Sequence, residues 1–271
     1  MPSKVPIYGA DAKASGEAAL PAAFDEPVRA DLIKRAAISD QTWYYQPKGT
    51  KPRAGMATSA RYRGRKDDFG SIKNHGIAMR AHEVLAKGKW GKARIIPGSF
   101  KGRRAHPPKI EEVLIEKMNK REYAKALHSA MAASASMQAV TARGHKVPQK
   151  LLLPIVFDSS VEEKVSKTAL MNELLLRLGF EAELARADKS KRRSGVGSRK
   201  GGAIRAKTLL LVVGAKDAPL ARAARNIAGV DVVSAKHLRV LDLAPGAKAG
   251  RLTAYTQSAL TAIAGEGKKK E

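Results

Sequence analysis

The sequence contains no cysteine, which excludes disulfides, thiol catalysis and cysteine-based zinc sites. Its six histidines form no His-Glu-x-x-His or His-x3-His pair, so we expect no metal site. No apolar run approaches the roughly eighteen residues of a membrane span. The first residues, MPSKVPIYGADAKASGE, also lack the hydrophobic block of a signal peptide. We therefore expect a cytoplasmic protein without a membrane partner.

Motifs that carry catalysis are missing as well. The sequence has no G-x4-G-K-[ST] loop and no GxSxG elbow. The glycines at 195, 197, 201 and 202 follow a run of charges instead of a buried strand, and they open no predicted helix. Asp158 follows an apolar run but has no nearby His or second acid, so a helix cap is a better interpretation than a catalytic carboxylate. We expect no enzyme activity and no cofactor.

Acidic residues are scarce relative to basic ones. The 271 residues include 51 Lys and Arg against 25 Asp and Glu, a formal net charge of +26. Such a chain repels itself and attracts polyanions. Because 44% of the residues are hydrophobic, the chain can still bury a core. These numbers predict a folded body whose partner is a nucleic acid.

Residues 41–109 form a segment without the apolar periodicity of helices or strands. Seventeen Lys or Arg stand there against three acids, a net charge of +14, and nine glycines interrupt the segment. Disordered segments contain few aromatics, yet seven of the chain's thirteen aromatic residues lie in it. Structureless loops of this length are uncommon unless they bind something or are disordered. The segment is therefore predicted to be an extended basic binding loop.

A second basic loop is predicted over residues 186–207, where nine basic residues face a single acid, Asp188. A solvated charged surface is the alternative interpretation of any charge run. Two glycine-rich basic runs in one chain favour a polyanion clamp. Residues 266–271 are predicted to be a short basic C-terminal tail.

The remaining residues, 1–40 and 110–265, show the alternating pattern of an α/β domain. Helices are predicted over 26–39, with Asp25 as the N-cap and Pro27 near the first position, and over 120–140, with Asn119 and Glu122 as a capping box. Further helices are predicted over 162–179, closed by Gly179, after Asp217 and Pro219, and at the C-terminal end. Strands are predicted at 151–157, 208–214, 229–235 and 251–256. These elements predict one three-layer domain with a mostly parallel central sheet.

Arg and Lys neutralise phosphates, aromatic side chains stack on unpaired bases, and glycines let the backbone approach the nucleic acid. This combination favours folded RNA over duplex DNA. The residues predicted to bind RNA in the first segment are Trp43, Lys51, Arg53, Arg61, Tyr62, Arg63, Arg65, Lys66, Lys73, Arg80, Trp90, Lys92, Arg94, Lys101, Gly102, Arg103, Arg104, His106 and Lys109. Those in the second are Lys189, Lys191, Arg192, Arg193, Arg199, Lys200 and Arg205.

Two alternative functions stay open at this point. A methyltransferase-like α/β enzyme that modifies RNA would use the basic insertion to grip its substrate, although the glycine fingerprint for a nucleotide cofactor is missing. A basic chromatin protein would instead prefer duplex DNA to RNA.

The block GRRAHPPK (102–109) resembles the end of the long loop in the archaeal and eukaryotic-type family of large-subunit ribosomal protein four. Three further blocks are similar to the same family and occur in its order: LPAAFDEPVRADLIKRA (20–36), ARNIAGVDVVSA (224–235) and DLAPGAKAGRLTAYTQSAL (242–260). The resemblance implies an α/β domain on the solvent side of the large subunit and a loop that threads through large-subunit rRNA toward the peptide exit tunnel.

The resemblance also implies partners and limits which residues carry over. Expected partners are large-subunit rRNA and neighbouring ribosomal proteins, including a second protein that lines the tunnel, and no homo-oligomer is expected. The centre of the loop lacks the family's Ser-Phe/Trp-Gly-x-Gly-Arg-Gly segment, so only Gly102 to Lys109 transfer position by position as RNA contacts. AHEVLAK (81–87) has helical character and predicts a short helix within the loop.

Overall fold

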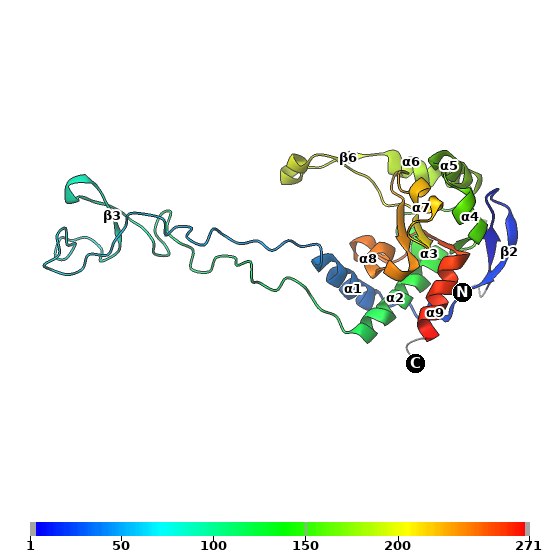
Figure 1. Ribbon diagram of the computed structural model, residues 1–271, viewed down its shortest axis with the longest axis horizontal. Helices are drawn as coiled ribbons and strands as arrows, with labels where there is room; N and C mark the ends of the chain where they lie inside the picture. The colour runs from blue at the N-terminus through cyan, green and yellow to red at the C-terminus, as the bar shows by residue number, and fades with distance from the viewer. Residues whose placement is uncertain (1–3, 150, 269–271) are drawn as a thin grey trace. The chain divides into compact units, whose positions relative to one another are not determined.

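The computed structural model describes residues 4–149 and 151–268. The chain divides into two units: the body, Met1–Tyr44 with Ile115–Glu271, and the long loop, Tyr45–Leu114 (Figure 1). Gln41 and Thr42, which the sequence assigns to the loop, complete the last turn of helix α1 (Ala30–Thr42). At the C-terminal end α9 (Gln257–Lys268) continues into the predicted basic tail, of which residues 269–271 lie outside the described residues.

The body is built on a six-stranded sheet with the order β2-β1-β5-β10-β8-β9. Its strands are β1 (Lys4–Tyr8), β2 (Ala14–Ala19), β5 (Ile155–Phe157), β8 (Leu210–Val213), β9 (Asp231–Ser234) and β10 (Thr253–Thr256). Neighbouring strands are parallel from β1 to β9, and only β2 at the edge is antiparallel. The predicted mostly parallel α/β sheet is therefore confirmed.

Helices cover both faces of this sheet (Figure 1). On one face Val156, Leu210 and Tyr255 pack with α1, α2 (Lys120–Ala135), α8 (Val240–Leu243) and α9. On the other face Phe157 and Leu211 pack with α4 (Ser159–Lys164), α5 (Thr168–Arg177) and α7 (Pro219–Ala224). Successive strand residues point to opposite faces, so strands covered on both sides are apolar throughout.

Several predicted helices have different ends in the structure. The first begins at Ala30 instead of residue 26, because a short 3-10 helix (Ala22–Phe24) and an extended Arg29 precede it. The helix predicted over 120–140 breaks at Ser136, where the backbone is extended and the Ser136 hydroxyl accepts a hydrogen bond from the Ala139 N–H. Ser136 thereby ends α2 and caps α3 (Met137–Ala142).

The remaining predictions of helix caps, helices and strands are confirmed only in part. Asn119 caps α2 as predicted, but Glu122 pairs with Arg35 instead of completing a capping box. The helix predicted over 162–179 is two helices, α4 and α5, since Val165 and Lys167 leave helical geometry; Gly179 closes α5 with a positive φ of 84°. The strand predicted at 151–157 shortens to Ile155–Phe157. The β1–β2 hairpin and α6 (Glu181–Asp188) were not predicted.

The prediction of a short helix at residues 81–87 is wrong. His82–Val84 is strand β3, which pairs antiparallel with β4 (Trp90–Ala93). The intervening turn, Ala86–Gly88, carries positive φ at Lys87 and Gly88, and the Leu85 N–H donates to the Lys89 carbonyl. A hairpin satisfies these backbone groups across the pair, whereas seven residues are too few for a stable isolated helix.

Candidate nucleic-acid interface

The long loop leaves and rejoins the body at one point, the C-terminal turn of α1. The Ser39 hydroxyl donates to the Glu116 carbonyl at 2.5 Å, and the Thr42 hydroxyl accepts from the Glu116 N–H at 3.1 Å. Ser39 and Thr42 are both buried. These bonds hold the chain on either side of the loop together. This anchor was not predicted, and its only local signal is a pair of hydroxyl residues three positions apart at the end of a helix.

The carboxylate of Asp40 also fixes the C-terminal turn of α1, through hydrogen bonds to the body. It accepts hydrogen bonds from the Tyr123 hydroxyl at 2.9 Å and from the Leu241 N–H at 3.1 Å, which links α1 to α2 and α8. Burial, reinforced by Asp40, raises the pKa of Tyr123, so the phenol stays protonated and keeps donating. The root of the loop is therefore part of the rigid body.

Within the long loop, the outgoing and returning limbs run side by side because glycines let them approach. A Cβ on Gly49 would lie 2.7 Å from the side chain of Ile110, and one on Gly55 would lie 2.5 Å from the backbone of Gly102. Gly55 also has a φ of 75°, which disfavours any other residue. The Thr50 N–H donates to the Pro108 carbonyl at 3.3 Å. The two limbs thus form a paired stem.

A cavity of about 340 Å³ lies between the limbs, where several predicted RNA contacts meet. Its lining includes the cations Lys51, Arg103, Arg104 and Lys109, together with Gly102. The apolar part of the lining comes from Pro52, Met56 and Pro107. This arrangement brings the GRRAHPPK block against the outgoing limb, with cations placed for phosphates and apolar surface for a base or ribose.

The end of the long loop is locally ordered around Trp90 and Ile72. The Trp90 indole N–H donates to the Gly70 carbonyl at 2.8 Å, and its ring lies 5.0 Å from that of His75. Ile72 is buried, and its N–H donates to the Arg63 carbonyl. The loop, which the sequence predicts to lack helical or strand periodicity, therefore has local order of its own around the buried Ile72.

Four predicted RNA residues are partly buried in the loop and have partners there. Arg94 pairs with Glu83 at 2.6 Å, and this hydrogen bond lowers the pKa of Glu83. Arg63 donates to the Phe69 carbonyl, Trp90 to Gly70, and Gly102 to Ser99. Their RNA contacts stay predictions, and the structure adds a role in holding the loop together.

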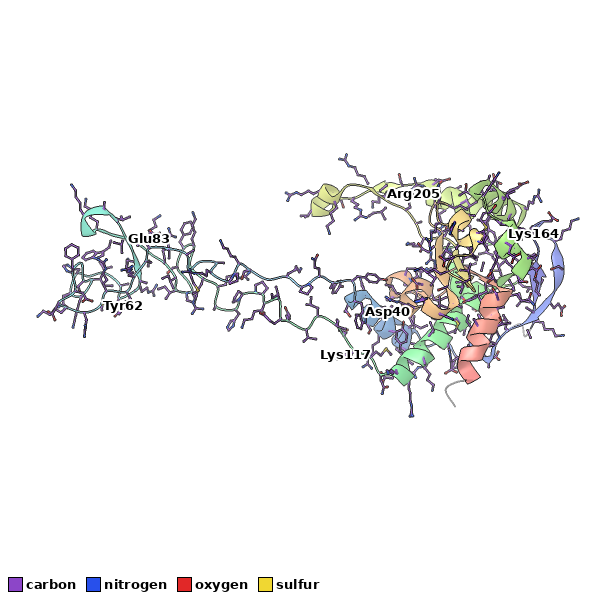
Figure 2. The ribbon with its side chains drawn as sticks, viewed as in Figure 1. Asp40, Tyr62, Glu83, Lys117, Lys164 and Arg205 are labelled. Atoms are coloured by element: carbon purple, nitrogen blue, oxygen red, sulfur yellow. The ribbon has the colours of Figure 1, made fainter. Side chains whose placement is uncertain are left out.

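The other predicted residues are exposed, and side chains stand out from the ribbon along the loop, with Tyr62 among them (Figure 2). They are Trp43, Lys51, Arg53, Arg61, Tyr62, Arg65, Lys66, Lys73, Arg80, Lys92, Lys101, Arg103, Arg104, His106 and Lys109, and in the second basic loop Lys189, Lys191, Arg192, Arg193, Arg199, Lys200 and Arg205.

The second basic loop is a short two-stranded ribbon, β6 (Lys191–Arg192) with β7 (Ala203–Ile204). Gly195 begins a 3-10 helix (Gly195–Lys200) between them, which was not predicted. At its base the Arg186 guanidinium donates to the Lys207 carbonyl at 2.8 Å and to the buried Glu183 carboxylate at 2.6 Å. Charged residues at the ribbon's end are exposed while its base is fixed to the body.

Glu183 is the buried centre of this base. Its carboxylate also lies 2.7 Å from His145 Nδ1 and accepts from the Lys146 N–H at 2.9 Å. Burial opposes ionisation, but the hydrogen bonds from His145, Arg186 and Lys146 outweigh it and lower the pKa of Glu183 to about 2. The carboxylate therefore stays charged at neutral pH.

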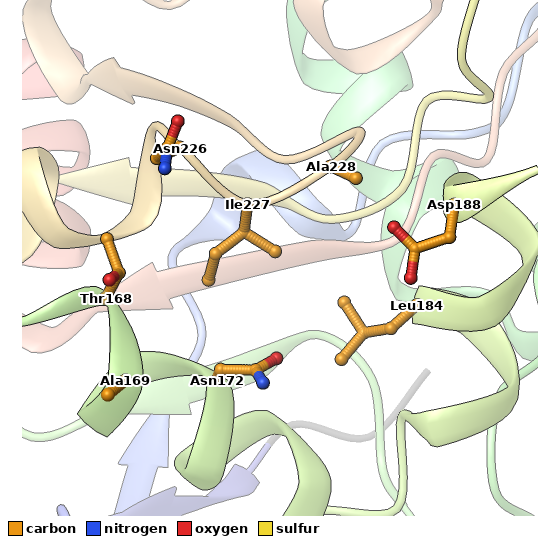
Figure 3. Close-up of a pocket in the computed structure, with 8 residues that line it drawn as sticks. All are labelled: Thr168, Ala169, Asn172, Leu184, Asp188, Asn226, Ile227 and Ala228. Carbon is orange, nitrogen blue, oxygen red and sulfur yellow. The ribbon is translucent and has the colours of Figure 1, made fainter. Parts of the chain in front are cut away.

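A pocket of about 330 Å³ on the body does not have the residues of a catalytic site (Figure 3). Asp188 is its single charged side chain, and it has no acid or base partner there. Residues from α5, from α6 and from the turn before β9 line it: Thr168, Ala169, Asn172, Leu184, Asp188, Asn226, Ile227 and Ala228. Across residues 4–149 and 151–268, no three His, Asp or Glu side chains gather closely enough to hold a metal. Over the same residues, no helix is long and apolar enough to cross a membrane.

The carboxyl ends of the parallel strands are closed by the chain itself. Glu162 of α4 accepts hydrogen bonds from the Gly214 N–H at 3.1 Å and from the Ser258 hydroxyl at 2.5 Å. A Cβ on Gly214 would lie 2.5 Å from the Ser258 hydroxyl oxygen, so β8 and α9 meet without a gap. Asp158 stands at the predicted N-cap position of α4, but its side chain makes no capping hydrogen bond to the helix backbone. Its carboxylate accepts from the Ser160 hydroxyl at 2.6 Å instead.

Comparison with known proteins matches residues 18–266 to the family described as Ribosomal protein L4/L1 family. The chain is 42% identical over 264 residues to the large ribosomal subunit protein uL4 of Methanococcus maripaludis, which covers 96% of this chain and 98% of the relative. Similar relatives with the same name occur in Methanocaldococcus jannaschii, 42% identical over 95% of this chain and 96% of the relative, and in Nanoarchaeum equitans, 39% identical over 96% of this chain and 97% of the relative.

Proposed function

Because the chain belongs to the ribosomal protein L4/L1 family and is a structural constituent of the large ribosomal subunit, we propose that its long loop enters large-subunit rRNA and helps to line the peptide exit tunnel. Its place in the cell is accordingly the large subunit of the cytoplasmic ribosome. The proposal extends to a role in subunit assembly.

The observation that carries the proposal is the paired stem of the long loop. Gly49 and Gly55 bring the limbs close enough for a narrow stem, while Lys51, Arg103, Arg104 and Lys109 border the cavity between them. A narrow stem with exposed cations fits between RNA segments, where each phosphate contact releases counterions. The second basic loop, with exposed cations on a fixed base, supplies a second rRNA contact.

Sedimentation tests the assignment to the subunit. The full chain should sediment with large subunits through a high-salt cushion, and recovery only in the free pool would contradict it. A photo-crosslinker placed at Tyr62 in the long loop should react with large-subunit rRNA in assembled subunits. The same group placed at Lys164 on α4 provides a matched control on the body.

The partners follow from the same proposal. Large-subunit rRNA is the principal one, and neighbouring ribosomal proteins, among them a second protein that lines the tunnel, contact the loop or body. Crosslinks from Tyr62 to ribosomal proteins in assembled subunits would identify them. A crosslink pattern restricted to the small subunit would contradict the proposal.

We also propose that the role is structural and not enzymatic. In doubly wound α/β enzymes the cofactor phosphates bind at the carboxyl ends of the parallel strands. Here the Gly214 N–H, at the carboxyl end of β8, donates its hydrogen bond to the Glu162 carboxylate instead of to a phosphate. Ser258 packs directly against Gly214. A methyltransferase-like protein would bind S-adenosylmethionine, so a calorimetric titration of the full chain with that cofactor should show no binding heat. Saturable micromolar binding would favour the enzyme.

A further inference from the structure

Phe100 is an exposed aromatic side chain on a tight turn of the long loop. The turn is closed by hydrogen bonds from the Arg103 N–H to the Ile95 carbonyl at 3.2 Å and from the Gly102 N–H to the Ser99 carbonyl at 2.9 Å. Phe100 itself is 68% exposed, so its ring adds little to the packing of the loop. The backbone is fixed while the ring faces solvent.

Three cations surround this ring. The distance from the ring centroid is 5.7 Å to Lys92 Nζ, 5.8 Å to the guanidinium carbon of Arg94 and 5.6 Å to Lys101 Nζ. Contact of a cation with a ring face occurs within about 6 Å, so all three are at the outer limit of that range and leave much of the ring accessible. The Arg94 guanidinium also donates to the Phe100 carbonyl and pairs with Glu83, which fixes one cation beside the ring.

The charges around Phe100 are poorly balanced by the loop itself. Glu83 pairs with Arg94, while Lys92 and Lys101 are both exposed. Like charges so close together repel each other, and an exposed cation–ring contact offsets little of that repulsion. A ligand that supplies both a flat aromatic face and negative charge on either side of it would satisfy the ring and the two lysines together.

We propose that Phe100 is a stacking platform for one unpaired nucleotide of large-subunit rRNA, with Lys92 and Lys101 contacting its flanking phosphates. The proposal rests on the proposed function and adds a site to it. An acidic peptide would neutralise the lysines but would leave the ring without a stacking partner, whereas every nucleotide carries a base and a phosphate. The platform reads no base edge, so it accepts any of the four bases.

The test is the affinity of the full chain for deproteinised large-subunit rRNA, measured by filter binding over a range of salt concentrations. Phe100→Leu keeps an apolar side chain but removes the aromatic face, and it should weaken binding about tenfold, as expected for loss of one stacked base. The salt dependence should not change, since no phosphate contact is lost. Phe100→Trp should bind as tightly as the unaltered chain.

Two controls separate stacking from charge and from general aromatic exposure. Lys101→Gln should reduce the slope of log affinity against log salt by about 0.7, the value for one phosphate contact on single-stranded RNA. Phe69→Leu alters a residue that is 84% exposed in the same loop and has no cation over its ring within the described part of the chain, so its binding should not change.

Equal binding by Phe100→Leu and the unaltered chain would overturn the platform, and so would an equal loss in Phe100→Leu and Phe100→Trp. Those results leave the proposed function standing if the unaltered chain still prefers large-subunit over small-subunit rRNA. Loss of that preference in the unaltered chain would remove the proposed function and the platform together.

Discussion

Replacing the long loop by a short linker should stabilise the isolated body instead of weakening it. The exchange substitutes the seventy residues Tyr45–Leu114 with six Gly and Ser residues. Six residues suffice because Ser39, Thr42 and Glu116 already hold the two ends together. Every residue of the two hydrophobic clusters of the body lies outside the loop, so neither core is touched.

The expected magnitude follows from chain entropy. Folding the body closes a loop, and each doubling of loop length costs about 0.6 kcal/mol. Shortening seventy residues to six is about three and a half halvings, so the free energy of unfolding should rise by about 2 kcal/mol. For a body of this size the melting temperature should rise by about 4–8 °C. The exchange also removes seventeen basic and five acidic residues, a net charge of +12, which acts in the same direction.

Urea unfolding followed by circular dichroism measures this difference. A control chain with a seventy-residue Gly and Ser linker keeps the entropic cost while it removes the charge and the side chains. Its stability should fall between those of the unaltered chain and the short-linker chain. A short-linker chain less stable than the unaltered one by more than about 1 kcal/mol would refute the entropic reasoning.

Three further predictions address the cations and the buried charges. Changing the four cations of the stem cavity to Gln should lower the slope of log rRNA affinity against log salt by about 3. The same change at four exposed lysines of the body, Lys13, Lys34, Lys164 and Lys167, should lower this slope far less. Equal decreases in slope would show that the position of the cations does not matter. The charged form of Glu183 should stabilise the fold fully above about pH 4.5, and this contribution of about 3 kcal/mol should disappear as the pH falls toward 2, because its folded pKa of about 2 lies below the unfolded value. Urea unfolding at pH 7 and pH 3 should therefore give a smaller difference for Glu183→Gln than for the unaltered chain, and equal differences would contradict the assignment. Arg251→Lys should lower the free energy of unfolding in urea by about 2–4 kcal/mol, because one ammonium cannot reach Asp231 and the carbonyls of Thr208 and Asp242 together. Lys207→Met removes an exposed partner of Asp231 and should lower it by less than about 1 kcal/mol. Similar losses in the two variants would refute the argument.

The strands of the body show what could be predicted and what could not. TLLLVVG (208–214) and RLTAYT (251–256) contain β8 and β10, because strands covered on both faces must be apolar along their length. The hairpin of β1 and β2 was missed: ASGEAA (14–19) carries no alternating apolar pattern, and its exposed residues form a strand because β1 offers them a pairing edge. Pairing of that kind depends on a partner distant in sequence, as β1 and β5 also show.

The interface divides in the same way. Charge, glycine content and aromatics were sufficient to locate the basic loop and to predict most of its exposed residues, since exposure of Lys and Arg is the default. The internal partners of Arg94 and Trp90 could not be predicted, because Glu83 and Gly70 reach them only when the chain turns back on itself. The predicted helix at 81–87 failed for the same reason, since strand β4 supplied the hydrogen-bond partners.

The sequence by itself determined the mostly parallel α/β class and the strongly basic loop, since burial periodicity and net charge are properties of residues taken in order. Only the tertiary structure decided which groups meet. It joined Ser39 and Thr42 to Glu116, closed the carboxyl ends of the strands with Glu162 and placed three cations around Phe100. Such contacts arise between residues far apart in the chain, and they form only where the backbone path brings complementary groups within bonding distance.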